Sequence, residues 1–142
     1  MTYDEQDDEA RLFREGIELF NAGEWFEAHE VWEDAWRMAT GQRKLFYQGL
    51  IQCAVTLEHV RRGNPRGVRS VWASCQTKFD GITGRYMAVD VPVLPHDMRH
   101  FIQTVLDMPA EAFAPGSSRG QAMPVDFATS PRIELEGDPF HA

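Results

Sequence analysis

The chain has 142 residues, 43% of them hydrophobic, which suits one domain with a single core. Its 14 Lys and Arg against 22 Asp and Glu give a net charge of −8, and this acidity argues against general binding to nucleic acids or anionic membranes, which need a positive field. No apolar stretch approaches the roughly 20 residues of a membrane span, and the acidic start resembles neither a signal nor a transit peptide, so we expect a cytoplasmic protein.

The first hairpin is predicted from helix start and stop signals. The segment Thr2-Tyr3-Asp4-Glu5 is typical of a capping box and predicts the start of the first helix. Gly23 is expected to end that helix in the left-handed conformation, and a second helix follows from Glu24 to about Thr40. The apolar stripe of the first helix contains Ala10, Phe13, Ile17 and Phe20. The solvent face of the second contains Glu27, Glu30, Asp34 and Arg37.

A long third helix, from about Gln42 to Arg62, is predicted to be the central one. It has no charged residue between Lys44 and Glu58, a run too long for a strand and too short to span a membrane. Gly63 then provides a stop, and Asn64 is placed to cap the next helix.

Two more helices and a tail complete the predicted organisation. The fourth helix is expected to end around Gly81 or Gly84, and the fifth to run from Pro95 to Asp107. Prolines, glycines and serines accumulate after Met108, so we predict one helical domain over residues 1–108 and an extended or partly disordered tail over 109–142. Within the tail, Ile133-Glu134-Leu135 is a candidate for docking as an extended strip.

Cys53 and Cys75 both fall on apolar helical stripes. Free cysteine at such positions behaves as a small hydrophobic residue, and two cysteines do not make a disulfide framework. Their pattern therefore indicates a reducing compartment.

The two hairpins are related as an internal repeat. An offset of about 40 residues places Gly23 over Gly63 and Trp32 over Trp72, and the small and large residues of the first hairpin follow tetratricopeptide spacing. Two such units are fewer than the roughly three that a solenoid needs, so the fifth helix should cap the exposed end. The predicted fold is all-α: a compact bundle of about five helices, with two tetratricopeptide-like hairpins, a capping helix and an extended C-terminal tail.

Two segments suggest a family. They are Gly23-Glu24-Trp25-Phe26-Glu27-Ala28-His29-Glu30-Val31-Trp32-Glu33-Asp34-Ala35-Trp36, and Phe46-Tyr47-Gln48-Gly49-Leu50-Ile51-Gln52 continuing to His59, Arg62, Gly63, Asn64 and Gly67. Together they closely resemble the family called domain of unknown function 309, over about residues 10 to 80. The resemblance implies an all-helical fold and no particular activity.

Polar residues interrupt the apolar stripes of the second and third helices. If these residues face one another, the two helices enclose a polar cluster, which is either a hydrogen-bond network that fixes helix register or a pocket for a small ligand or metal. The candidate ligand-binding residues are His29, Glu30, Glu33, Gln48, Gln52 and His59.

No catalytic constellation or metal site is predicted. The segment from His29 to Glu33 resembles the zinc-protease signature, but Glu33 occupies the place of its second histidine. His96 and His100 lie one turn apart without an evident third ligand and are interpreted as part of a solvated face. The sequence does not identify a cofactor.

A basic cluster forms the candidate partner-binding surface. Arg66 and Arg69 lie near the start of the fourth helix, where positive charge is mildly unfavourable. They are expected either to pair with acidic residues of the first two helices or to bind an anion or an acidic peptide. The candidate partner-binding residues are Arg62, Arg66, Arg69 and Trp36.

Two functions fit these features. The first is a non-catalytic interaction module that binds another protein or peptide, with self-association favoured by its tryptophan-rich faces. The alternative is a small-ligand or metal-binding protein, extending to a hydrolase, that works from the cluster around His29 and Glu33.

Overall fold

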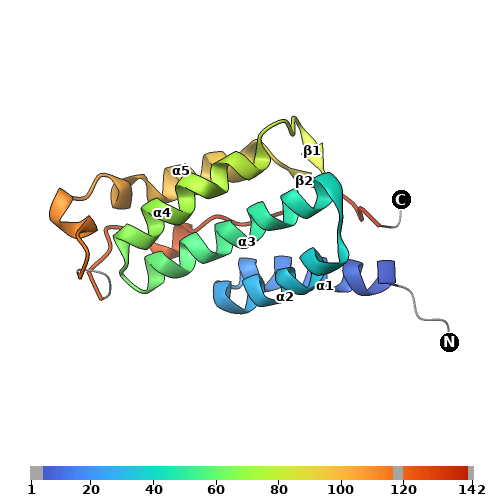
Figure 1. Ribbon diagram of the computed structural model, residues 1–142, viewed down its shortest axis with the longest axis horizontal. Coiled ribbons are helices and arrows are strands. Elements are labelled where there is room, and N and C mark those ends of the chain that lie inside the picture. Colours follow the sequence, from blue (N-terminus) through green and yellow to red (C-terminus); the bar gives the residue numbers. More distant parts are fainter. Residues whose placement is uncertain (1–4, 117–119, 141–142) are drawn as a thin grey trace.

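The computed structural model describes residues 5–116 and 120–140, with the side chains of residues 5 and 6 excepted. The described part is an all-α bundle, as predicted, with a small two-stranded sheet (Figure 1). Its α-helices are α1 (Glu5–Asn21), α2 (Trp25–Met38), α3 (Gly41–Arg61), α4 (Pro65–Cys75) and α5 (Val93–Leu106). The predicted capping box at Thr2 lies outside the described residues.

Consecutive helices pack as neighbours. The α1–α2 and α3–α4 pairs each turn back on themselves through a short loop, and α5 packs against α4 and α3 (Figure 1). The predicted hairpin pairs and additional helix are therefore confirmed, whereas the tetratricopeptide character of the hairpins and the domain boundary at residue 108 stay predictions.

The predicted loop signals work locally as expected. Gly23 and Gly63 adopt φ values of 78° and 65°, in the left-handed region that a Cβ atom disfavours. The side chain of Asn64 accepts a hydrogen bond of 3.1 Å from the backbone nitrogen of Gly67 and so caps α4. These stops separate the helices with few connecting residues.

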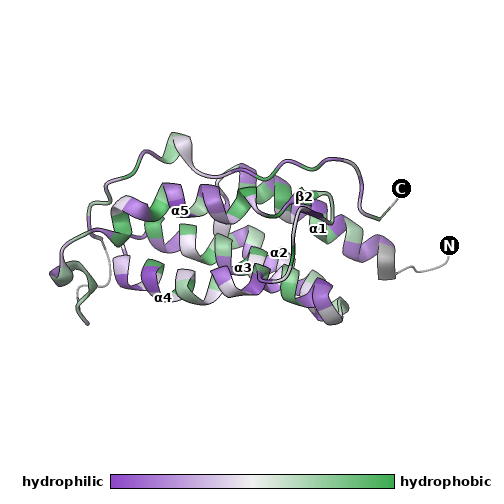
Figure 2. Cartoon of the chain, turned by 90° about the horizontal axis from the view of Figure 1, so that it is seen from above, coloured by the Kyte–Doolittle hydropathy of each residue, from purple (hydrophilic) through white to green (hydrophobic). Residues whose placement is uncertain are grey.

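α3 occupies the centre of the bundle, as its uncharged stretch predicted. It packs against α2 on one side and against α4 and α5 on the other. Figure 2 shows hydrophobic and hydrophilic residues alternating around the helices that flank it. Its buried residues are Phe46, Tyr47, Gly49, Leu50, Cys53, Ala54, Thr56, Leu57 and Val60.

Two glycines allow close helix packing. A Cβ atom on Gly16 would lie 2.1 Å from Nε1 of Trp32, whose indole N–H donates a 3.2 Å hydrogen bond to the carbonyl of Phe13. A Cβ atom on Gly49 would lie 2.6 Å from the ring of Phe79. In both places a tryptophan or phenylalanine ring fills the space that the missing side chain leaves.

The structure corrects the predicted end of the fourth helix. α4 ends at Cys75 and tightens into a 3₁₀ turn, Gln76–Phe79, instead of continuing to Gly81 or Gly84. The turn places Phe79 over Gly49, with its ring 6.1 Å from that of Phe46.

A β-hairpin follows that the sequence did not indicate. Strands β1 (Arg85–Tyr86) and β2 (Val89–Asp90) pair antiparallel around Met87 and Ala88, which both adopt positive φ. Such a turn usually carries glycine or asparagine, so its sequence signal is absent here. α5 then begins at Val93, two residues earlier than predicted, because a proline such as Pro95 is tolerated in a first turn.

The segment after α5 lies along the bundle. It contains the 3₁₀ turns Ala110–Phe113 and Phe127–Thr129 and runs back beside α5 towards the β-hairpin (Figures 1 and 2). Ile133 is buried, so the predicted strip docks. Phe127 approaches the ring of Trp25, with the two centroids 6.2 Å apart.

A buried carboxylate ties α1 to α3. The side chain of Glu9 is 4% exposed, and it accepts hydrogen bonds from the hydroxyl of Tyr47 at 2.7 Å and from Arg43 at 2.8 Å. A buried carboxylate is costly unless it is paired and bonded in this way. Burial and then the bond to Glu9 raise the pKa of Tyr47 well above its ordinary value.

Replacing Tyr47 with phenylalanine should lower the free energy of unfolding by about 1–3 kcal/mol, because one oxygen of Glu9 loses its donor inside the protein. Urea unfolding followed by circular dichroism measures the loss. Tyr86→Phe is the matched control, since among the described residues the Tyr86 hydroxyl makes no hydrogen bond while its ring contacts Phe46. An equal loss in both variants would contradict a specific role for the Glu9 bond.

The same bond predicts a dependence on alkaline pH. Because the pKa of Tyr47 is raised in the folded state, its contribution is fully present below the ordinary tyrosine pKa of about 10 and declines as the pH rises above that value. Wild-type stability should therefore fall more steeply than that of Tyr47→Phe between about pH 9.5 and 11. Equal slopes would contradict the prediction.

Candidate functional site

His29 lies on the side of α2 that borders α3. Its side chain is 19% exposed, so it is less buried than the tryptophan stripe suggested. Nδ1 lies 2.7 Å from the carbonyl of Phe26, and Nε2 lies 3.3 Å from Oε1 of Glu33. The carbonyl and the carboxylate both accept hydrogen bonds, so a ring with one proton donates to Phe26 or to Glu33, and a ring with two protons donates to both.

One depression lies between α2 and α3 beside Glu33. Its volume is about 370 Å³, and Glu33 and Arg37 stand opposite Gln48 and Gln52. Trp36 and Ile51 supply its apolar surface, and the ammonium of Lys44 lies 4.1 Å from the centre of the Trp36 ring. The lining therefore combines aromatic, amide and charged groups.

A smaller depression of about 160 Å³ lies further along the same two helices. The two depressions adjoin. His29 of the smaller one contacts Glu33 of the larger one, and Val55 of the smaller one lies one turn after Ile51 of the larger one on α3. We call the two together the α2–α3 furrow. It is lined by Trp25, Phe26, His29, Glu33, Trp36, Arg37, Gln48, Ile51, Gln52, Val55, Glu58, His59 and Arg62.

The structure divides the predicted polar cluster between the two depressions. Glu33, Gln48 and Gln52 line the first, and His29 and His59 line the second. Glu30 is exposed on the outer face of α2 and lines neither. The six candidates thus do not form one enclosed pocket.

Gln52 and His59 are held by α4. The amide nitrogen of Gln52 donates a 3.0 Å hydrogen bond to Oγ of Ser74, and Nδ1 of His59 lies 3.1 Å from the amide nitrogen of Asn64. A Cβ atom on Gly67 would lie 2.6 Å from that histidine nitrogen. The α3–α4 packing therefore orients these furrow residues.

The predicted basic cluster is spread over several environments. Arg61 stacks on the ring of Trp25 at 4.3 Å, and Arg62 pairs with Glu58 at 3.1 Å. Arg69 lies 4.2 Å from the centre of the Phe113 ring. Within residues 5–116 and 120–140, neither Arg66 nor Arg69 pairs with an acidic residue of α1 or α2, and only Arg62 of the four contributes to the furrow.

Two exposed apolar side chains were missed by sequence reasoning. Phe26 is 42% exposed in the furrow, and Leu45 is 51% exposed on α3, one turn before Gln48. A phenylalanine among the acidic residues of a solvent face is the signal that could have identified the first. Apolar side chains left in solvent beside aromatic ones are typical of interaction surfaces.

Several polar atoms at the furrow are buried without a bond. In the described part of the chain these include Nε1 of Trp25, Nε1 of Trp36 and Oε1 of Gln52. Such atoms cost free energy in the unbound protein.

The described residues hold no group of three or more His, Cys, Asp and Glu side chains suited to a metal ion.

Cys53 and Cys75 are free and buried, with their sulfurs 3.5 Å apart, and burial raises the pKa of the Cys53 thiol. Across the described helices, none is both long and apolar enough to cross a membrane.

The fold and the furrow define a small helical-hairpin protein with an open groove between neighbouring helices. More particularly, residues 13–71 match the model of the family described as domain of unknown function (DUF309), which confirms the resemblance seen in the sequence. The matched segment runs from α1 into α4 and contains every residue that lines the furrow.

The similar proteins carry no functional name. An uncharacterized protein of Aquifex aeolicus (strain VF5) is 33% identical over 82 residues, covering 52% of this chain and 25% of its own length. The uncharacterized protein YpuF of Bacillus subtilis (strain 168) is 36% identical over 59 residues, covering 41% of this chain and 34% of its own length. This chain therefore spans between a quarter and about a third of the relatives it matches.

Replacing His29 with alanine should cost about 1 kcal/mol of folding free energy, because the carbonyl of Phe26 loses a donor. Glu30→Ala, one residue away on the exposed face, should change stability by less than about 0.5 kcal/mol. Thermal and urea unfolding of the two variants provide the comparison. If the two variants lose the same stability, the His29 bond is not structural.

Proposed function

We propose that the α2–α3 furrow binds a segment of another protein and that the chain is a non-catalytic interaction module. The observation that carries this proposal is the composition of the furrow: two adjoining depressions lined by aromatic and aliphatic side chains, each with charged residues beside them. Interfaces are enriched in such aromatic and Arg residues, with polar groups at their edges.

The dimensions of the furrow suit a helical segment. On α3 and its C-cap residue, the lining residues recur at spacings of three and four from Gln48 to Arg62, which at the rise of an α-helix is a distance of roughly 20 Å. A partner helix laid between two helices places its own apolar residues at the same spacing. About four turns of an amphipathic helix would occupy the furrow.

The polar groups support binding with a defined orientation. Glu33 and Arg37 flank one depression, and Glu58 and Arg62 flank the other, so both signs of charge are present at each. The unpartnered indole N–H of Trp36 and side-chain amide oxygen of Gln52 would gain bonds if a partner reoriented these side chains. Complementary charges determine the position and direction in which a partner segment binds more than they add to its affinity.

The proposed partner is a protein, in the same compartment as this chain. The net charge of −8 disfavours nucleic acid and anionic membrane as partners. Two buried free thiols fit a reducing compartment, which we take to be the cytoplasm. The furrow could also take a second copy of the chain, and the native mass spectrometry below distinguishes that copy from a different protein.

A small-ligand or metal-binding protein, extending to a hydrolase, remains the second candidate. The observation that favours it is the oriented ring of His29, whose Nε2 faces the furrow rim beside Glu33. An imidazole held between two acceptors is an arrangement that catalytic and ligand-binding histidines share.

Photo-crosslinking in the native host tests the first proposal. A benzophenone amino acid in place of Phe26 should capture a discrete partner protein, whereas the same probe in place of Val93 on α5, which is also exposed, should not. Adding Trp36→Asp should reduce capture at least about tenfold, since central aromatic residues carry much of the binding energy of an interface. Equal capture from both positions would contradict a specific furrow interface.

Native mass spectrometry separates the other outcomes. A species with twice the mass of one chain would indicate that two copies associate through the furrow. A bound small molecule or metal that is present in wild type and lost from His29→Ala, with no protein captured at Phe26, would support the second candidate and reject the first.

A further inference from the structure

Residues 120–140, which we call the strap, are attached to the bundle at several separate points. At its start, the backbone nitrogens of Gly120 and Gln121 donate to the carbonyls of Arg62 and Gly63 at 2.9 and 3.1 Å. Further along, the hydroxyl of Thr104 donates to the carbonyl of Pro124 at 2.8 Å. The strap thus crosses from the α3–α4 loop to α5.

The last part of the strap is bound by Asn21 at the end of α1. The Asn21 amide nitrogen donates to the carbonyl of Ile133 and the amide oxygen accepts from the nitrogen of Ile133, both at 2.7 Å. One side chain therefore satisfies both main-chain groups of one extended residue, as a neighbouring strand would. Recognition of this kind reads the backbone and not the identity of the side chain.

Basic side chains of the bundle face the acidic residues that follow. Glu136 pairs with Arg85 of β1, and its backbone nitrogen donates to the carbonyl of Ala88 at 2.9 Å. Asp138 lies 3.3 Å from Arg14 of α1. Beyond Asn21, two arginines thus pair with carboxylates three and five positions after the clamped residue.

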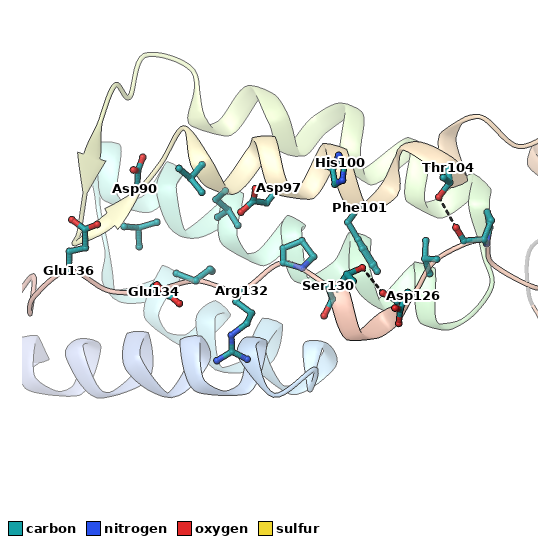
Figure 3. Close-up of a pocket in the computed structure, with 18 residues that line it drawn as sticks. Asp90, Asp97, His100, Phe101, Thr104, Asp126, Ser130, Arg132, Glu134 and Glu136 are labelled. Atoms are coloured by element: carbon teal, nitrogen blue, oxygen red, sulfur yellow. Dashed lines mark hydrogen bonds between the residues drawn. The ribbon is translucent and has the colours of Figure 1, made fainter.

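The strap does not fill the groove in which it lies. A cavity of about 760 Å³ separates it from α5 and β2, with Asp97 and His100 on one side and Ser130 and Glu134 on the other (Figure 3). Between Gly120 and Phe140, the fully buried residues are Pro131 and Ile133. Loose packing of this kind lowers the free energy needed to lift a segment from its neighbours.

We propose that the groove beneath the strap is a second protein-binding site, which takes an extended acidic segment of another protein in place of the strap. That segment has an aliphatic residue at the Ile133 position and acidic residues three and five positions later. The proposal goes beyond the helical partner of the α2–α3 furrow, because Asn21, Arg14 and Arg85 line no part of the furrow.

Competition explains why such a site would be regulated. The strap is joined covalently to its groove, so a separate partner binds only the fraction of molecules in which the strap has lifted, and its apparent affinity is lowered by that fraction. A change that weakens the strap without altering the groove should therefore increase partner affinity.

The test uses the full chain with Ile133→Asp, which places a charge in the buried position of the strap and leaves Asn21, Arg14 and Arg85 intact. The probe is a fluorescein-labelled synthetic peptide with the sequence of residues 129–140, followed by fluorescence anisotropy. The variant should bind this peptide at least about tenfold more tightly than wild type does. Ala128→Asp is the matched control, because it adds the same charge at an exposed position of the strap that does not line the cavity, and this variant should behave as wild type.

Further variants test the proposed chemistry. Adding Asn21→Ala to Ile133→Asp should reverse the gain, and a peptide with lysine at both positions that match Glu136 and Asp138 should bind at least about tenfold more weakly. Trp36→Asp should leave peptide binding unchanged, which separates this site from the furrow. If Ile133→Asp fails to fold, the double variant Glu136→Lys, Asp138→Lys releases the strap from its charged contacts without changing the core.

Two results would overturn the proposal. The first is a released variant that keeps its helical circular dichroism and binds no peptide, which would make the groove a purely intramolecular contact. The second is a dimer in native mass spectrometry that forms by exchange of straps and excludes the peptide, which would make the occupant a second copy of this chain.

Discussion

The uncharged stretch of α3 is the constraint on which the rest of the structure depends. Because no side chain from Leu45 to Leu57 carries charge, the helix can be surrounded by protein, and α2, α4 and α5 pack around it. α1 meets α3 through a polar contact, in which Tyr47 and Arg43 donate hydrogen bonds to the buried carboxylate of Glu9. A polar contact at that place fixes the rotation of α3, and with it the set of side chains that the helix presents to the furrow.

Most of the helical architecture could be predicted because its signals are local. Gly23, Gly63 and Asn64 act on their own backbone, and the solvent face of α2 follows from spacing alone. The shortened α4 and the β-hairpin could not be predicted, because Phe79 responds to the distant Gly49 and because Met87 and Ala88 lack the residue types that mark such a turn. Tertiary packing overrode propensity at both places.

The candidate site was predictable as a set of residues and not as an arrangement. His29, Glu33, Gln48 and Gln52 were selected because polar side chains interrupt apolar stripes, and all four line the furrow. Their division into two depressions depends on how two helices are offset along their axes, which spacing within either helix does not reveal. The strap contacts join residues distant in sequence, more than 100 positions apart for Asn21 and Ile133, and have no local signal.

The ring of Trp25 has a consequence for the molecule as a whole. It lines the furrow on one side, and Phe127 of the strap contacts it on another. A ligand that displaces the strap removes this contact and so changes the surroundings of a furrow residue. If the two occupants favour different positions of Trp25, thermodynamic linkage requires each to alter the affinity of the other by the same factor. One indole ring would then make the chain an adaptor whose two binding equilibria are coupled.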